Sequence, residues 1–121
     1  MGMNKYQAKA METCVDQSAN TAYMLTGLTA EVGEINDKVA KWIRKGIARF
    51  DDNYLVFNTS EINERNAYTV ELVKELGDVL WFVAGLSSRL GVSLEDVAQM
   101  NIQKLASRKQ RGVIVGEGDN R

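Results

Sequence analysis

The chain has 121 residues, one cysteine, no proline and no histidine, and its formal net charge is −1 at pH 7. This length fits one domain with a real core, and the near-neutral charge argues against binding to a nucleic-acid polymer or an anionic membrane surface. The lack of histidine excludes Ser-His and Cys-His catalysis and imidazole metal sites, and the single Cys14 excludes an intrachain disulfide.

Four helices are predicted from the spacing of apolar residues. The first covers residues 4–14. The second covers residues 21–44, with apolar residues at steps of three and four, and is expected to stop at Gly46. The third covers residues 66–90, and the fourth begins after a Ser93 cap and ends near Arg108.

The third helix is apolar on nearly every side between residues 79 and 86, with Trp81 off its main stripe. A helix of this kind is buried on all sides, and in so small a domain a second copy is expected to cover one of them. The predicted fold is therefore all-α and four-helix bundle-like, completed by homo-oligomerisation as a homodimer or homotetramer.

The remaining segments are expected to be less regular. Residues 47–64 are predicted to be a connecting loop, containing a turn followed by a short extended piece. Residues 1–111 are predicted to form the domain and residues 112–121, rich in glycine, a flexible tail. No leader segment and no membrane span is visible in the sequence, so we expect a cytoplasmic protein.

Two acidic motifs carry the chemistry. Glu31 and Glu34 are three residues apart on the second helix, and Glu75 and Asp78 are three residues apart on the third. This spacing places each pair on one helix face, so packing of the two helices would bring four carboxylates together. At about 5 Å each pair would repel by roughly 3 kcal/mol at an effective dielectric near 20. Such a cluster requires cations, and oxygen-only ligands suit Mg²⁺ or Mn²⁺.

One acidic pair alone would more often be an exposed helix face. Here both pairs flank apolar stripes, and each encloses a glycine, Gly33 or Gly77. A glycine inside a helix costs about 1 kcal/mol relative to alanine. Close approach of the helix backbones, or of a phosphate to the backbone, would explain both glycines, and the repetition favours a site.

Basic and amide side chains lie downstream. Lys38, Lys41 and Lys45 share a helix side with the first acidic pair, where they either compensate its charge or meet phosphate oxygens. On the fourth helix, Asn101, Lys104 and Arg108 follow steps of three and four, which by itself is more typical of a solvated face.

The combination Glu31-x-x-Glu34, Glu75-Leu-Gly-Asp78-Val-Leu-Trp-Phe and Asn101-x-x-Lys104 resembles the MazG-like nucleoside triphosphate pyrophosphohydrolases. These belong to the all-α NTP pyrophosphatase superfamily, alongside the dimeric dUTPases. The resemblance implies that the four acids hold Mg²⁺, and we expect Glu31 or Glu34 to orient the attacking water. It further implies that Lys41, Asn101 and Lys104 contact the nucleotide or its phosphates.

The implied function is hydrolysis of nucleoside triphosphates, with deoxynucleotides favoured, to the monophosphate and pyrophosphate, as in cleansing of the nucleotide pool. One alternative is a dUTPase-like specificity. Another is a non-enzymatic helical module in which the acids form a structural metal site or a solvated face and Trp81 anchors a partner. The sequence does not determine the base, and the stretch between the acidic pairs is longer than is common in the family.

Overall fold

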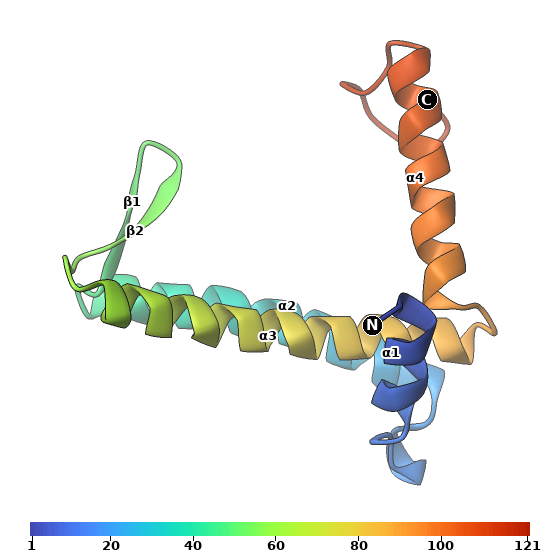
Figure 1. The fold of residues 1–121 in the computed structure, drawn as a ribbon, viewed down its shortest axis with the longest axis horizontal. Helices are drawn as coiled ribbons and strands as arrows, with labels where there is room; N and C mark the ends of the chain where they lie inside the picture. Colours follow the sequence, from blue (N-terminus) through green and yellow to red (C-terminus); the bar gives the residue numbers. More distant parts are fainter.

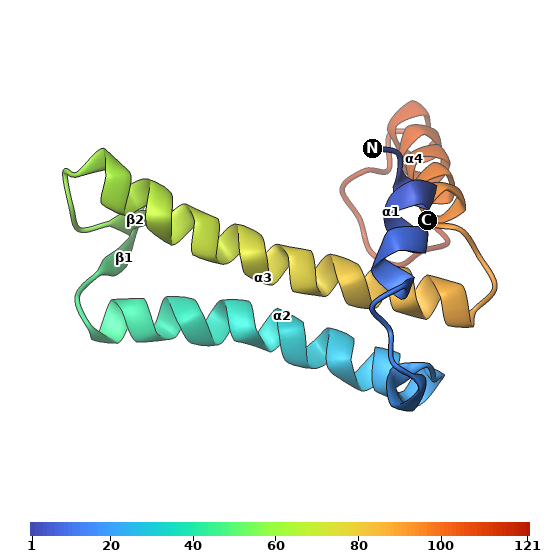
Figure 2. The same cartoon turned by 60° about the horizontal axis from the view of Figure 1, so that its bottom comes forward.

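The computed structural model describes residues 1–121 and is mostly helical, which confirms the all-α class. Helices α2 (Thr21–Arg44) and α3 (Ile62–Arg89) run side by side as a long antiparallel pair (Figures 1 and 2). The short helix α1 (Met3–Met11) crosses one end of this pair, and α4 (Leu94–Gln110) rises from the same end. A single 3₁₀ turn, Asp16–Ser18, joins α1 to α2.

Two glycines set the spacing between α2 and α3. A Cβ atom at Gly27 would overlap the Phe82 ring, and one at Gly85 would overlap the Met24 side chain. Met24 and Phe82 are themselves buried, so these contacts form the core of the helix pair. Gly33 and Gly77 are not points of close helix approach within one chain, because a Cβ at either position meets open space, and the alternative of a phosphate near the backbone stays a prediction.

A β-hairpin stands at the other end of the pair, where the sequence predicted a loop. Strands β1 (Ala48–Asp51) and β2 (Tyr54–Phe57) pair antiparallel, joined by Asp52 and Asn53 with φ of 48° and 68°. Two such residues with positive φ form the turn that suits a two-residue hairpin, and Asp and Asn tolerate it best among residues with side chains. The hairpin is anchored by Phe57, whose ring lies 5.4 Å from Trp42 and 5.1 Å from Tyr68 between centroids.

Helices α2 and α4 each begin directly after a residue whose side chain caps the helix. The Asn20 side chain accepts a hydrogen bond from the Tyr23 backbone N–H at the start of α2. The Ser93 hydroxyl accepts one from the Asp96 backbone N–H at the start of α4, and this second cap was predicted from the sequence. Helix α3 begins at Ile62, four residues before the predicted start, and α1 ends at Met11 rather than Cys14.

A second core lies where α1, α3 and α4 meet, around Ala10, Ala84 and Leu94. Gln7 fastens α1 to the turn between α3 and α4: its amide donates to Ser88 Oγ (3.0 Å) and accepts from the Leu94 backbone N–H (2.9 Å). The Trp81 indole donates to the Ala10 carbonyl on α1 and to the Thr13 hydroxyl just after that helix. Trp81 thus makes internal contacts, and the partner-anchor role that the non-enzymatic alternative gives it stays a prediction.

The helices do not close into a bundle within one chain. Helix α4 projects steeply away from the α2–α3 pair (Figure 1), and only 10 of the 121 residues are buried. Many large apolar side chains therefore remain exposed in a single chain. No helix has the length and apolar character needed to cross a membrane.

Candidate metal centre

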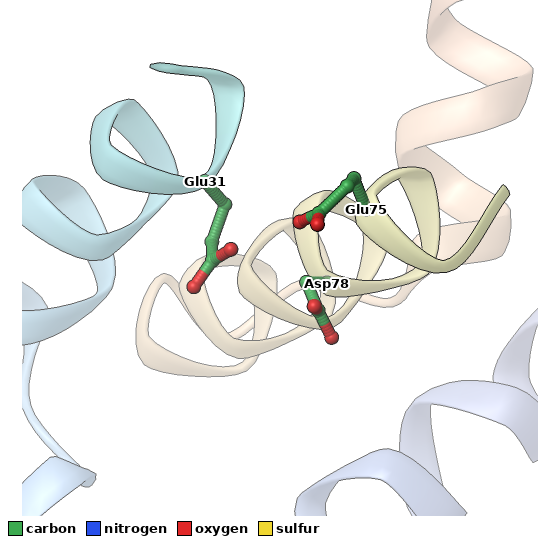
Figure 3. Close-up of side chains that lie close together, drawn as sticks. All are labelled: Glu31, Glu75 and Asp78. Atoms are coloured by element: carbon green, nitrogen blue, oxygen red, sulfur yellow. The ribbon is translucent and has the colours of Figure 1, made fainter. Parts of the chain in front are cut away.

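Three of the four predicted acids converge between α2 and α3. Ligand oxygens of Glu31, Glu75 and Asp78 all lie within 4.8 Å of one another. Figure 3 shows Glu31 extending from α2 toward α3, from which Glu75 and Asp78 project. The structure thus brings carboxylates together across the helix pair, as expected from the two motifs.

The helix contact at Gly27 places these acids opposite one another. Glu31 follows Gly27 by four residues on α2, and Asp78 precedes Phe82 by four residues on the antiparallel α3. Because one helical turn is about 3.6 residues, each acid lies one turn from the contact between Gly27 and Phe82, in the same direction. The absence of a side chain at Gly27 therefore lets the two helices approach closely enough for the acids to meet.

The carboxylates are close enough to perturb one another. Partial burial raises the pKa of Glu31, and the negative charges of Asp78, Glu75 and Glu34 raise it further. Both effects disfavour the ionised form of the carboxyl group. A cation placed between these oxygens would reverse the repulsion.

Lys38 was expected either to compensate the charge of the first acidic pair or to meet phosphate, but in the structure it pairs with acids of α3. Its ammonium lies 3.2 Å from Glu75 and 3.6 Å from Glu71, so it joins α2 to α3 beside the cluster. Spacing places Lys38 on the helix side of Glu31, and Glu71 on that of Glu75, but the contact between the two helices is set by the tertiary structure. One ammonium leaves the group of three carboxylates with excess negative charge.

Tyr6 on α1 is a residue that sequence reasoning missed. Burial raises the pKa of its hydroxyl, and the nearby charge of Asp78 adds to the effect. The Tyr6 ring also lines an apolar cavity of about 240 Å³ with Leu80 and Leu94. No spacing rule connects α1 to the acidic motifs, so only the tertiary structure could reveal this neighbour.

Glu34 and Lys41 lie outside the three-carboxylate group. Glu34 is exposed, although its charge contributes to the raised pKa of Glu31. The Lys41 ammonium pairs with Asp37, one turn earlier on the same helix, at 2.6 Å. Their predicted roles in metal and phosphate binding stay predictions.

Asn101 and Lys104 are not brought to the acids within one chain. They line an open hollow of about 400 Å³ on α4, together with Val97 and Met100. Asp78 lies eleven residues before the end of α3 and Lys104 ten residues after the start of α4, about 15 Å along each axis. Because α4 turns steeply away (Figure 1), these two distances separate the acids from the predicted phosphate-binding residues.

The chemistry of the donor set fits a hard divalent cation. All three side chains offer carboxylate oxygens, and neither histidine nor a second cysteine is present in the chain. Oxygen ligands of this kind suit Mg²⁺, Mn²⁺ or Ca²⁺ rather than zinc or copper. Glu31, Glu75 and Asp78 would therefore hold the ion, with Glu34 next to them on α2.

Comparison with known proteins agrees with this interpretation. The chain is 39% identical over 128 residues to the Gene 37 protein of Mycobacterium phage L5, and the match covers all of both chains. No solved structure matches the chain. A sequence model described as the MazG nucleotide pyrophosphohydrolase domain matches residues 19–113, which include both acidic motifs and both α4 residues. The chain therefore belongs to the MazG nucleotide pyrophosphohydrolase family.

Proposed function

We propose that this protein hydrolyses nucleoside triphosphates, with deoxynucleotides preferred, to the monophosphate and pyrophosphate in a Mg²⁺-dependent reaction, as part of nucleotide-pool cleansing. The observation that carries the proposal is the convergence of Glu31, Glu75 and Asp78 within 4.8 Å across two helices. Family membership supports the reaction class. Mn²⁺ has the same preference for oxygen ligands and would substitute for Mg²⁺.

The reaction requires one bond to form and one to break. The oxygen of water bonds to the α-phosphorus, and the bond from that phosphorus to the oxygen bridging to the β-phosphorus breaks. Pyrophosphate leaves, and the proton of the water passes to a carboxylate. Mg²⁺, when bound, neutralises charge on the triphosphate and acidifies the water.

The residues of the chain divide this work by their chemistry. Glu75 and Asp78 would hold the divalent cation beside the phosphates. Glu31 or Glu34 orients the water and accepts its proton. A carboxylate is the natural base here, because the chain has no histidine.

We further propose that a second copy of the chain completes the site, in a homodimer or homotetramer. Lys41, Asn101 and Lys104 would bind the phosphates and the nucleotide, but α4 projects away from the acids of its own chain. The face of α3 that carries Val73, Leu76 and Leu80 is exposed, although it is apolar. Packing of a second copy there would bury this face and offer another α4 to the acids.

Incubation of the purified chain with Mg²⁺ and a panel of nucleoside triphosphates tests the reaction. We expect pyrophosphate and the nucleoside monophosphate in equal amounts. Asp78→Asn and Glu34→Gln should each reduce kcat by about a hundredfold or more, because each removes charge from the site.

Glu12→Gln is the matched control, since Glu12 is exposed at the end of α1 and should keep wild-type activity. Release of orthophosphate as the only primary product would contradict the proposal. The same panel measures the base preference, including any dUTPase-like selectivity.

A further inference from the structure

Arg108 is the one charged side chain that is buried in this structure. It lies near the end of α4 with 5% of its surface exposed. Its Nη2 donates to the backbone carbonyls of Gly118 (3.3 Å) and Asp119 (3.1 Å) and to Asp119 Oδ1 (3.2 Å). Its Nε is buried without a hydrogen-bond partner. A buried guanidinium is costly unless it is paired, so the chain end that Arg108 holds is part of the folded structure.

The tail, residues 112–121, is closed by a second arginine. Arg121 donates to the carbonyls of Val113 (3.0 Å), Ile114 (3.3 Å) and Gly118 (2.6 Å), and its own carbonyl accepts from Arg111 (2.8 Å). These bonds satisfy backbone carbonyls in a segment without helix or strand. The tail thus folds back on itself and lies against α4, forming a closed loop of hydrogen bonds that we call the ring. The flexibility predicted for the tail stays a prediction.

Asp119 joins this ring to Lys104. Its Oδ1 accepts from Arg108 and also lies 3.2 Å from the Lys104 ammonium. Both contacts lower the pKa of the Asp119 carboxyl, with the hydrogen bond from Lys104 the larger cause. The Lys104 side chain remains 40% exposed. An ammonium has three donors, so donors of Lys104 are left for another anion.

Lys104 also borders the open hollow on α4 that Asn101 lines one turn earlier. A phosphate entering this hollow would meet the Asn101 amide and a lysine already held in place. The alternative is that Asp119 blocks Lys104 and must be displaced before a phosphate binds. Displacement of Asp119 would require the tail to detach from α4, which would break the hydrogen bonds made by Arg108 and Arg121. These bonds therefore favour an Asp119 that stays in place and orients Lys104.

We propose that residues 112–121 form a strap that positions Lys104 for a phosphate group of the nucleotide, with Asp119 as the positioning residue and the buried Arg108 as its anchor. This inference rests on the proposed function, because it assumes that the ligand of Lys104 is a nucleoside triphosphate. A flexible lysine loses conformational freedom when it binds, and a lysine held in advance loses less.

A double-mutant cycle between Asp119 and Lys104 tests the strap. The measurements are the Kd of an α,β-methylene deoxynucleoside triphosphate with Mg²⁺, by calorimetry, and kcat and KM for the hydrolysable nucleotide. We expect Asp119→Asn to raise Kd and KM about threefold with kcat nearly unchanged, and Lys104→Met to raise Kd about tenfold. In the Lys104→Met background, Asp119→Asn should have no further effect, because Asp119 acts through Lys104.

Two variants control for general damage to the tail. Glu117→Gln removes a neighbouring exposed carboxylate that forms no ion pair and should bind as the wild type does. Asp119→Glu keeps the charge and should recover most of the lost affinity. Unchanged binding in Asp119→Asn, or equal losses in both backgrounds, would overturn the proposal. Tighter binding would also overturn it, since that is the signature of an inhibitory tail. Absence of pyrophosphate release by the wild-type chain would instead contradict the proposed function, independently of the binding cycle.

Discussion

At the scale of single residues, the carboxylate of Glu31 is the group in the candidate metal centre that repulsion and burial destabilise most clearly. It is half-buried and faces two carboxylates from α3, and both its burial and these charges raise its pKa. Lys38 offsets this repulsion only from the side of Glu75. In the metal-free chain the cluster therefore works against folding, and binding of a cation would turn the same residues into a stabilising contact.

This conflict predicts a pH dependence for the stability of the metal-free chain. The folded state of Glu31 binds its proton more tightly than the unfolded state, so the free energy of unfolding falls as pH rises above the ordinary carboxyl value of 4.5. Glu31→Gln should be more stable than the wild type at pH 7 by up to about 1 kcal/mol, with the difference vanishing at more acidic pH. Urea unfolding of both proteins in EDTA over a pH series measures it.

Addition of Mg²⁺ should reverse the order of stability, because only the wild type gains binding energy from the ion. The control is Glu12→Gln, whose unfolding should follow the wild type at every pH. A wild-type chain that becomes more stable relative to Glu31→Gln as pH rises, in EDTA, would contradict the assignment.

At the scale of elements, the α2–α3 pair depends on two of its glycines and not on the other two. Gly27 and Gly85 meet Phe82 and Met24, whereas Gly33 and Gly77 face open space within the chain. The helix contact that aligns the acids is therefore one turn away from the motif glycines. The motif glycines remain available for close approach by a ligand or by another chain.

Alanine substitutions should separate these two kinds of glycine. Gly27→Ala forces the buried Phe82 ring to move and should destabilise the chain by about 1 to 2 kcal/mol, since overpacking exceeds the gain in helix propensity. Gly33→Ala, six residues further on the same helix, should stabilise the isolated chain by up to about 1 kcal/mol. Chemical denaturation of both variants gives the comparison. Equal effects of the two substitutions would show that the contact with Phe82 does not control the packing.

At the scale of the whole molecule, a single chain leaves too much apolar surface in water. Val73 and Leu76 are each 57% exposed and Leu80 is 40% exposed, and the three follow helical spacing along one side of α3. Isolated exposed apolar residues are common in stable monomers, whereas a stripe of them along one helix side is typical of an interface. The proposed second copy would cover this stripe.

Substitution within the stripe should change the association state. Val73→Lys places a charge in the proposed interface and should shift the chain toward the monomer in sedimentation velocity, with a loss of thermal stability. Val115→Lys is the control, because Val115 is 97% exposed in the tail and lies outside the stripe. A wild-type chain that sediments as a monomer at micromolar concentration would contradict the proposed homo-oligomer.

Local patterns in the sequence were sufficient to predict most of the helices and the acidic motifs of this protein. Periodicity and capping predicted α2 with its observed bounds, and the Ser93 cap predicted the start of α4. Periodicity and capping depend on residues within one or two helical turns of each other, so they can be recognised in a single sequence. The two acidic motifs likewise indicated a carboxylate cluster before any contact between helices was known. A turn followed by a short extended piece was also predicted in residues 47–64, but the pairing of two strands around Asp52 and Asn53 was not, because the strands are short.

Contacts between distant parts of the chain decided the rest. The pairing of Gly27 with Phe82, the bridge from Lys38 to Glu71 and Glu75, and the packing of Trp81 on α1 join separate elements. The hold of Arg108 on the tail is of the same kind. By itself, the sequence determined the helices and the acidic chemistry, because both are set by local spacing. Only the tertiary structure decided which acids meet and where α4 projects, because these depend on how side chains from different elements fit together.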